Sequence, residues 1–431
     1  MTKGIVEALA SAALATVALA TLGGTAGFAQ DKVTLTYLAS QGWVYDAEQA
    51  LGKKFEEQTG IAIDYQIVPA DQYFNLLRTK LNSGEAPDIF GGQSGVTDLK
   101  LQYNVEKNAV DLSNEPWAST LDPLVAAQST VDGKLYGMTY WDTVGNSWVI
   151  NYNKKTFADN GIAVPTDYAG LKAACETLLA KGIQPMLEPV ADGWHHVLWF
   201  AELGPRYEEA TPGLADQLNA NKATFGGNEA MLKAVTELKD LFDSGCWGKT
   251  ALADTFADRT KFMASGQVAM VVAASGFGAE LENDYPDTNP EDYGVFLMPL
   301  ADNQVLNLNP AGPTMFISSA SPHIAEAKKY LEFLTQPENM KYFVENVPNA
   351  TGLPFEGVAK KLPPEIQAFL ANPKRGTVYQ TAVNYVNPQW MDIGKDLTAM
   401  FTGAMAPADV LTSIDKRRAE LAKAAKDPAW Q

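Results

Sequence analysis

The chain has 431 residues, with 33 Lys and Arg against 51 Asp and Glu, so its formal net charge is −18. This acidic balance excludes nucleic acid and anionic membrane surfaces as expected partners, because both are bound through clustered Lys and Arg. Hydrophobic residues make up 46% of the chain and charged residues 19%, as in a folded protein. The length exceeds the roughly 250 to 300 residues at which one core usually divides, so we expect two lobes.

The N-terminus has the pattern of an export signal. Lys3 precedes a weakly apolar run over residues 8–22, and Gly27 and Ala29 stand at the −3 and −1 positions of a signal-peptidase site. The run is shorter than the roughly 20 apolar residues that a transmembrane anchor needs. We therefore expect residues 1–29 to be removed as a signal peptide, which leaves a mature chain that starts near Gln30 in the periplasm.

The first predicted elements of the chain form a β-α-β pattern. Apolar and polar residues alternate over residues 33–37 and 61–67, which predicts two strands. Gly60 stands where a helix between them would end. The apolar residues of that helix recur every fourth position: Ala47, Leu51 and Phe55.

The same alternation continues along the chain. A helix is predicted from Asp71 as N-cap to Gly84, followed by a short strand over residues 88–90. Later elements are a helix capped by Thr166 that ends at Gly182, a helix that ends at Gly245, a strand over 268–272 and a helix after Ser321. Such alternation predicts an α/β fold with a parallel sheet, which binds ligands at the carboxyl ends of its strands.

The two cysteines, Cys175 and Cys246, leave two alternatives open. A disulfide is permitted in an oxidising compartment. Cys175 also shares an apolar helix face with Leu171 and Leu178, where buried free thiols are common. The separation of the two Cα atoms decides between them, and sequence does not supply it.

Catalytic and metal-binding motifs are not supported by the residues present. Gly248, Lys249 and Thr250 resemble the end of a P-loop, but Asp243 stands where its first Gly belongs. The adjacent His195 and His196 do not form a zinc motif. We expect neither a cofactor nor a metal. A carboxylate pair for glycoside hydrolysis stays open, because its separation is a tertiary property.

Aromatic residues suggest a binding site for sugars. Three of the nine Trp residues, Trp43, Trp141 and Trp194, follow predicted strands, as does Phe277. A sugar ring needs flat aromatic platforms beside hydrogen-bonding groups. Groups of this kind stand nearby in the sequence: Gln41, Asp142 and His195. The alternative is that these Trp residues fill the core, since Trp is highly buried on average.

Five segments carry motifs that are specific in their order and spacing. They are residues 81–89 (LNSGEAPDI), 132–138 (DGKLYGM), 150–157 (INYNKKTF), 262–270 (FMASGQVAM), and 325–335 (AEAKKYLEFLT) with Pro337 and Glu338 after it. In these segments the chain resembles the extracellular sugar-binding subunits of bacterial ABC importers, of the multiple-sugar or maltodextrin-binding type.

The resemblance implies an α/β periplasmic-binding-protein architecture, in which two interleaved lobes enclose a central ligand cleft. It implies crossings between the lobes near residues 141–147, 297–311 and 349–355. The N-terminal lobe would comprise residues 30–141 and about 301–351. The C-terminal lobe with its closing helices would comprise residues 142–300 and about 352–431.

The resemblance also implies the ligand site and the partner. The expected ligand-binding residues are Gln41, Trp43, Gln93, Trp141 and Asp142 on or near the cleft edge of the first lobe, Trp194, His195 and Phe277 from the second, Asn309 near a crossing, and Trp390 in the last helical region. A monomer would capture a mono- or oligosaccharide without turnover and deliver it to a membrane permease. Two alternatives stay open: the same fold with a polyamine, metal chelate or phosphate ester as ligand, and an exported glycosidase.

Overall fold

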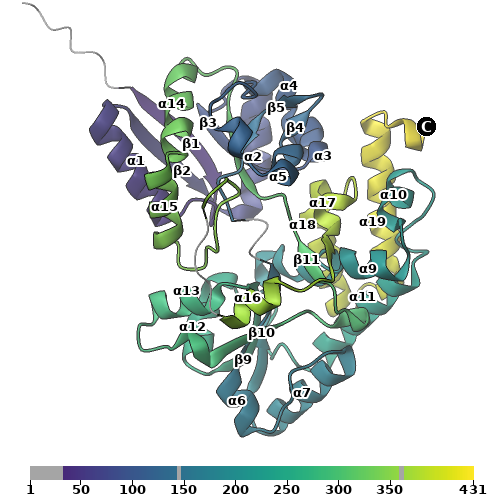
Figure 1. The fold of residues 1–431 in the computed structure, drawn as a ribbon. Coiled ribbons are helices and arrows are strands. Elements are labelled where there is room, and N and C mark those ends of the chain that lie inside the picture. The colour runs from purple at the N-terminus through teal and green to yellow at the C-terminus, as the bar shows by residue number, and fades with distance from the viewer. Residues whose placement is uncertain (1–32, 143–146, 359–363) are drawn as a thin grey trace, which may run out of the picture. The chain divides into compact units, whose positions relative to one another are not determined.

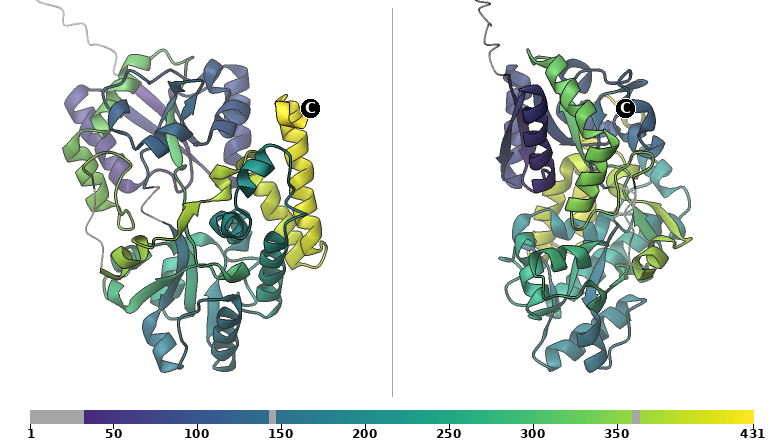
Figure 2. Two further views of the ribbon diagram at one scale, coloured as in Figure 1. Left: turned by 45° about the vertical axis from the view of Figure 1, so that its right-hand side comes forward. Right: turned by 60° about the vertical axis from the view of Figure 1, so that its left-hand side comes forward.

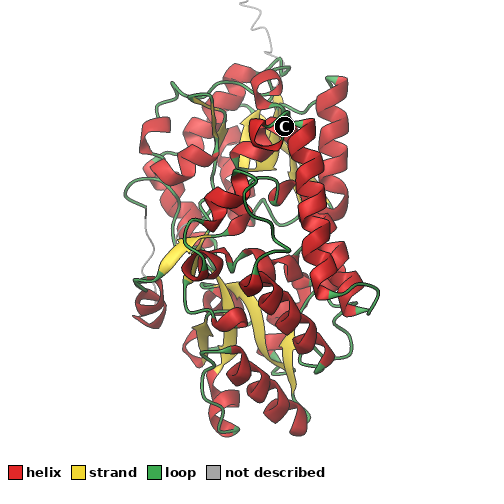
Figure 3. Cartoon of the chain, turned by 90° about the vertical axis from the view of Figure 1, so that its right-hand side faces the viewer, coloured by secondary structure: helices red, strands yellow, loops and turns green. Residues whose placement is uncertain are grey.

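The computed structural model describes residues 33–142, 147–358 and 364–431. The predicted signal peptide and the expected mature start near Gln30 lie outside the described residues. The described chain contains two main sheets with helices packed around them (Figures 1 and 3). We call each sheet with its helices a layer. Among the described helices, none is long and apolar enough to cross a membrane.

The first sheet has the strand order β2-β1-β3-β12-β6. Its strands are β1 (Thr34–Ser40), β2 (Ala62–Val68), β3 (Ile89–Gln93), β6 (Gly137–Met138) and β12 (Pro313–Ile317). β1 pairs parallel with β2 and β3, as the β-α-β pattern predicts. β12 is antiparallel to both β3 and β6, so the expectation of a wholly parallel sheet is wrong here. The reason is that β12 enters from the second sheet and not through a crossover helix.

Helices cover both faces of the first sheet. They are α1 (Asp46–Thr59), α2 (Ala70–Ser83), α3 (Val96–Asp98), α4 (Val105–Asn108), α5 (Pro123–Gln128), α14 (Ile324–Leu334) and α15 (Pro337–Asn346). Leu35 of β1 packs in one cluster with α1 and α14, whereas Leu38 packs in another with α2. This division follows from the alternation of side chains along a strand.

The predicted ends of the first two helices are confirmed, but one predicted start is wrong. Gly60 and Gly84 follow α1 and α2 with φ of +76° each, a conformation that glycine adopts at little cost. α2 begins at Ala70 with Pro69 in the N-cap position, and Asp71 lies inside the first turn. A short hairpin, β4 (Thr130–Val131) and β5 (Lys134–Leu135), precedes β6.

The second sheet has the strand order β10-β7-β9-β8. Its strands are β7 (Trp148–Asn153), β8 (Gln184–Leu187), β9 (Val268–Ala274) and β10 (Tyr293–Phe296). β8 and β9 run parallel, and β7 is antiparallel to both of its neighbours. This sheet therefore departs from the parallel expectation too, because β7 follows β6 of the first sheet with no helix between them among the described residues.

Most of the remaining helices surround the second sheet. They are α6 (Lys154–Asp159), α7 (Tyr168–Ala180), α8 (Leu198–Ala201), α9 (Gly204–Ala210), α10 (Leu214–Asn219), α11 (Glu229–Asp243), α12 (Arg259–Ala264), α13 (Phe277–Asp284), α16 (Pro364–Leu370), α17 (Tyr379–Ala382), α18 (Trp390–Phe401) and α19 (Pro407–Ala424). The last two helices pack on α11, and α19 runs along the side of this layer (Figure 2). The N-cap of α7 is Asp167 and not the predicted Thr166, because the Asp167 carboxylate accepts from the backbone N–H of Gly170.

The chain passes between the two sheets more than once. β6 and β7 belong to different sheets, as do β10 and β12, so the chain changes sheets after β6 and again after β10. The predicted third crossing is too early. Leu353 and Phe355 are buried in the core of the first sheet, and Phe355 forms a bridge with Leu121. The chain reaches the second layer by α16, which contacts β10, and β13 (Arg375–Thr377) then pairs with β11 (Leu306–Leu308).

Cys175 and Cys246 form a disulfide, with their Cα atoms 5.3 Å apart. Both cysteines are buried in the core of the second layer. The bond joins α7 to the turn after α11, where the Cys246 carbonyl also accepts from the backbone N–H of Met186 at 3.1 Å. The disulfide therefore fixes this turn against the start of β8.

We expect removal of the disulfide to lower the free energy of unfolding. The bond closes a loop with a sequence separation of 71 residues, for which the chain-entropy account gives up to about 4 kcal/mol. Urea unfolding of a Cys175→Ala, Cys246→Ala double variant should match that of the reduced wild-type protein. An unfolding midpoint equal to that of the oxidised protein would contradict this prediction.

Glu48 is a buried carboxyl group in the first layer. It lies on α1 with 1% of its surface exposed, and its Oε1 has no hydrogen-bond partner within the described residues. Burial raises the pKa of Glu48 from 4.5 to about 8. The neutral acid is thus the form that the folded protein favours.

This pKa shift predicts a loss of stability as pH rises. Between pH 4.5 and about 8 the unfolded chain releases the Glu48 proton while the folded chain retains it, so the free energy of unfolding falls over this window. Glu48→Gln should unfold like wild type at pH 5 and be more stable at pH 8, by roughly 2 to 4 kcal/mol. Urea unfolding at both pH values tests this, with Glu57→Gln on the exposed face of α1 as the control. Equal pH dependence in wild type and Glu48→Gln would refute it.

Candidate functional site

The nine Trp residues divide into two groups by burial. Trp117, Trp199 and Trp247 are core residues. The others are partly exposed: Trp43, Trp141, Trp148, Trp194, Trp390 and Trp430. Partly exposed aromatic rings are the ones that can contact a ligand, so the search for a site begins with them.

Two stacked rings lie in the first layer. Trp141 follows β6 and stacks on Tyr45, with ring centroids 4.8 Å apart and an interplanar angle of 21°. Tyr45 immediately precedes α1 and also contacts Phe343 of α15 edge to face. The sequence placed Trp141 in the site but did not single out Tyr45, although Tyr45 lies in the same loop as Trp43.

A second group of rings lies in the second layer. Trp194 contacts Trp148 and Phe256 edge to face, with centroids 5.9 Å and 5.3 Å away. Trp148 and Phe256 are themselves 5.8 Å apart. Trp148 begins β7 and pairs with Ala274, the last residue of β9. Sequence reasoning missed Trp148 and Phe256, since neither stands after a predicted strand.

Charged side chains lie beside the second group of rings. The Arg259 guanidinium lies over the Phe256 ring, 4.0 Å from its centroid, and forms an ion pair with Glu280. Burial raises the pKa of Tyr45, and the negative charges of Glu280 and Asp142 raise it further. The positive charge of Arg259 lowers it, so charges of the second layer act on a ring of the first.

Trp390 extends the second group. Its indole Nε1 donates to the Trp194 carbonyl at 3.0 Å. Nearby, His196 Nε2 and the Gly394 carbonyl are 2.8 Å apart, which ties α18 to the segment after Trp194. We call the two groups of rings together the aromatic row. Its members are Trp141, Tyr45, Phe256, Trp148, Trp194 and Trp390.

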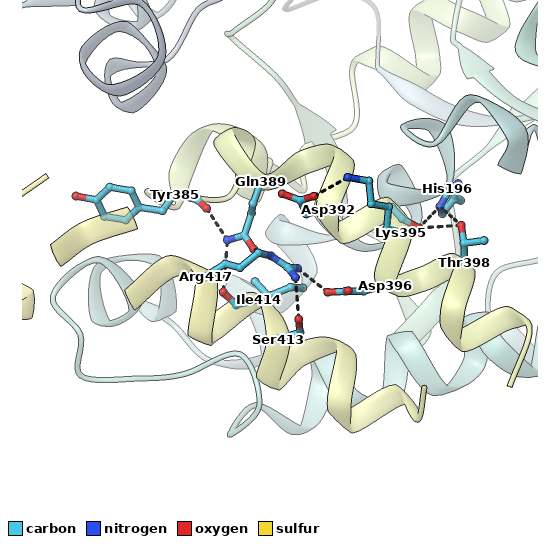
Figure 4. Close-up of polar contacts among 11 residues, drawn as sticks. His196, Tyr385, Gln389, Asp392, Lys395, Asp396, Thr398, Ser413, Ile414 and Arg417 are labelled. Atoms are coloured by element: carbon cyan, nitrogen blue, oxygen red, sulfur yellow. Dashed lines mark hydrogen bonds and ion pairs between the residues drawn. The ribbon is translucent and has the colours of Figure 1, made fainter. Parts of the chain in front are cut away.

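A polar network holds the start of α18, and with it Trp390, in place (Figure 4). Gln389 donates to the Tyr385 carbonyl at 2.6 Å and accepts from Arg417 Nε at 2.8 Å. Arg417 also donates to Asp396 at 2.6 Å. These bonds fasten α18 to α19, so the position of Trp390 depends on the closing helices.

His195 and Phe277, both predicted ligand residues, lie in the core. His195 has 0% of its surface exposed. Its Nδ1 is 2.6 Å from Glu188 Oε1 and its Nε2 is 3.1 Å from the Val272 carbonyl. Both ring nitrogens are therefore engaged by oxygen atoms of the protein. Phe277 is buried at the start of α13. We leave both residues out of the proposed site.

Two predicted polar residues hold the chain crossings. Asp142 Oδ2 accepts from the Thr351 hydroxyl at 2.6 Å and from the Thr351 backbone N–H. Asn309 donates to Gln380 Oε1 at 2.8 Å and accepts from the Thr381 hydroxyl at 2.6 Å. These bonds occupy the groups that were expected to face a ligand.

The other predicted residues lie near the ends of β1 and β3. Trp43 packs edge to face on Tyr73, with centroids 5.2 Å apart, and a Cβ at Gly91 would approach its ring to 3.1 Å. Gln41 is exposed, and Gln93 ends β3. Of the ten predicted ligand residues, the aromatic row therefore brings together three: Trp141, Trp194 and Trp390.

Two other kinds of site, a metal site and a small cavity, were weighed against the aromatic row. Within the described ranges, no cluster of His, Cys, Asp and Glu has the arrangement of metal ligands. A cavity of about 190 Å³ lies beside Asp98 and Asn387, where Asn387 donates to Asp98 at 2.7 Å. This volume is below the roughly 300 Å³ at which small-molecule pockets begin.

Known proteins of similar structure share the fold. A sugar transporter from Bacillus licheniformis, solved in complex with stachyose, has a TM-score of 0.72 at 20% identity and covers 90% of this chain and 100% of its own. A chitin oligosaccharide binding protein has a TM-score of 0.73 at 20% identity, with coverage of 91% and 99%. These matches confirm the α/β, two-lobed fold.

Sequence comparison gives the family. A multiple sugar-binding protein from Streptococcus mutans is 21% identical over 321 residues, which cover 73% of this chain and 74% of the relative. The osmoprotective compounds-binding protein GgtB from Synechocystis sp. is 25% identical over 301 residues, 64% of this chain and 69% of that protein. Residues 40–341, more than half of the chain, match the family described as bacterial extracellular solute-binding protein. The chain belongs to this family.

Proposed function

We propose that this extracellular solute-binding protein captures a carbohydrate on the aromatic row and delivers it to the permease of an ABC transporter. The observation that carries the proposal is the row itself, in which partly exposed rings stack in the first layer and contact one another in the second, with the ion pair of Arg259 and Glu280 beside them. A ligand that touched both groups of rings would connect the layers as well.

The chemistry of the row suits a sugar. A pyranose ring presents an apolar face of C–H groups, which packs on Trp and Tyr, and a rim of hydroxyls. The Arg259 Nε atom is buried and has no hydrogen-bond partner within the described residues. It is therefore a spare donor beside the Phe256 ring, and a sugar hydroxyl is a matching acceptor.

Relatives favour a carbohydrate over the other ligands considered. The Streptococcus mutans relative is a multiple sugar-binding protein, and the Bacillus licheniformis structure holds stachyose. A polyamine would need a cage of unpaired carboxylates, whereas Glu280 is paired with Arg259 and Asp142 accepts from Thr351. A phosphate ester would need unpaired cations, and the guanidinium of Arg259 beside the row is paired with Glu280.

The proposal includes the expected compartment and the absence of turnover. A cleaved signal and a net charge of −18 suit a freely diffusing monomeric carrier in the periplasm. The carboxylates next to the row are engaged by Arg259 and Thr351, which favours capture over glycoside hydrolysis.

Thermal unfolding with a panel of sugars tests the function. We expect at least one mono- or oligosaccharide to stabilise the protein by RT ln(1 + [L]/Kd), about 2.7 kcal/mol at a hundredfold excess over Kd. The sugar should be recovered intact after long incubation. No shift with any sugar would refute carbohydrate binding, and new reducing ends would support the glycosidase alternative.

Trp194→Ala tests the row directly. Loss of this ring should weaken sugar binding by about 1 to 3 kcal/mol, because it removes a platform and two ring contacts. The matched control is Trp430→Ala, since Trp430 is also partly exposed but lies at the C-terminal end, beside Arg418. Isothermal titration calorimetry of both variants measures the effect. Equal affinities in the two variants would place the ligand elsewhere.

A further inference from the structure

A second cavity, of about 410 Å³, lies in the second layer. This volume falls within the range of roughly 300 to 1,000 Å³ that is usual for small-molecule sites. Its wall includes the side chains of Gln184, Thr250, Asp254, Phe262 and Gln267. The proposed function uses none of these residues.

The cavity and the aromatic row lie at opposite ends of the same sheet. Gln184 pairs with Val268, so the cavity is at the start of β8 and β9. Trp148 of the row pairs with Ala274, at the end of β9. A strand of this length spans about 20 Å, so one small molecule cannot occupy both places.

Asp254 supplies an unusual polar group to the cavity. Only 9% of its surface is exposed. Its Oδ2 accepts from the Thr250 hydroxyl at 3.1 Å, while its Oδ1 accepts no hydrogen bond from any residue that the structure describes. Burial, and to a smaller degree the charge of Asp258, raises the pKa of Asp254. This oxygen is free to accept a hydrogen bond from a ligand hydroxyl.

The opposite wall is held in a fixed shape. The Gln184 amide donates to the Met186 carbonyl at 3.1 Å and to the Trp247 carbonyl at 3.3 Å. Gly248 has a φ of +76°, and a Cβ there would lie 2.6 Å from Gln184 Cδ, so the amide packs directly on this glycine. The disulfide at Cys246 secures the same turn. A preformed wall reduces the entropy that a ligand must lose on binding.

Phe262 and its neighbour indicate a neutral ligand. Phe262 is half-buried and packs with one side on the core, which leaves ring surface at the cavity for C–H groups. The Lys261 ammonium lies 5.6 Å from the centre of this ring, so a cationic ligand would meet a like charge. The amide of Gln267, which is exposed at the rim, can exchange hydrogen bonds with hydroxyls.

We infer that this cavity binds a small neutral polyhydroxy molecule, a monosaccharide or an alditol, as a second site separate from the aromatic row. The site combines an acceptor at Asp254, amide groups at Gln184 and Gln267, and an aromatic surface at Phe262. The inference does not rest on the proposed function, because the two sites share no residue.

Amide chemical shifts of the isotope-labelled full chain test the inference. D-glucose and D-sorbitol are titrated separately, up to the solubility limit of each, with putrescine as the cationic probe. We expect saturable shifts of the Gln184, Asp254 and Gln267 amides with a neutral probe, and the same shifts in Trp194→Ala. Asp254→Asn should raise the Kd about tenfold, as for the loss of a hydrogen bond to a charged group.

A second variant, Gln267→Ala, separates a loss of binding from a loss of folding. Gln267 is exposed, so its replacement should leave the fold intact and weaken binding severalfold, whereas exposed Gln72→Ala on α2 should leave it unchanged. No saturable shift at these amides with either neutral probe would overturn the inference while leaving row binding untouched. Saturation by putrescine alone, or equal effects of Gln267→Ala and Gln72→Ala, would also overturn it.

Discussion

The aromatic row depends on one buried hydrogen-bond network in the second layer. Glu188 Oε1 pairs with His195 Nδ1, and Glu188 Oε2 accepts from Trp199 Nε1 at 2.7 Å. His195 also reaches the Val272 carbonyl of β9. Every polar ring nitrogen in this network has a partner, so the network fixes Trp194, the residue next to His195, against the sheet. A fully satisfied buried network of this kind favours a single arrangement of the surrounding chain.

The chain crosses between the two layers at several segments. Hydrogen bonds of polar side chains fix these segments in place. Asp142 accepts from Thr351 at one crossing, and Asn309 exchanges hydrogen bonds with Gln380 and Thr381 at another. Hinge motion around a ligand takes place, in proteins built of two layers, at the few segments that cross between them. Asp142 and Asn309 therefore help to hold the two layers together.

Much of the fold could be predicted from the sequence, since helix periodicity and terminal glycines are local properties. The faces of α1 and α2 and the ends at Gly60 and Gly84 were predicted in this way. The antiparallel strand β12 and the late third crossing could not be, because both depend on packing between segments far apart in the chain. The family resemblance is confirmed by the match over residues 40–341.

The site was less predictable than the fold. Trp141, Trp194 and Trp390 were identified by their position in the sequence, yet Trp148 and Phe256 contact Trp194 only through tertiary packing. His195 was expected beside Trp194, but adjacent side chains point in different directions, and its ring is buried by Glu188 and Val272. The pairing of carboxylates, such as that of Glu280 with Arg259, likewise depends on the folded chain and could not be predicted from the sequence.

A crystal structure of the protein with its tightest-binding sugar tests the central claim most directly. The account predicts a sugar ring packed face to face on a member of the aromatic row, with a hydroxyl within hydrogen-bond distance of Arg259 Nε. A sugar that contacts none of these rings, or that occupies only the cavity at Asp254, would contradict it.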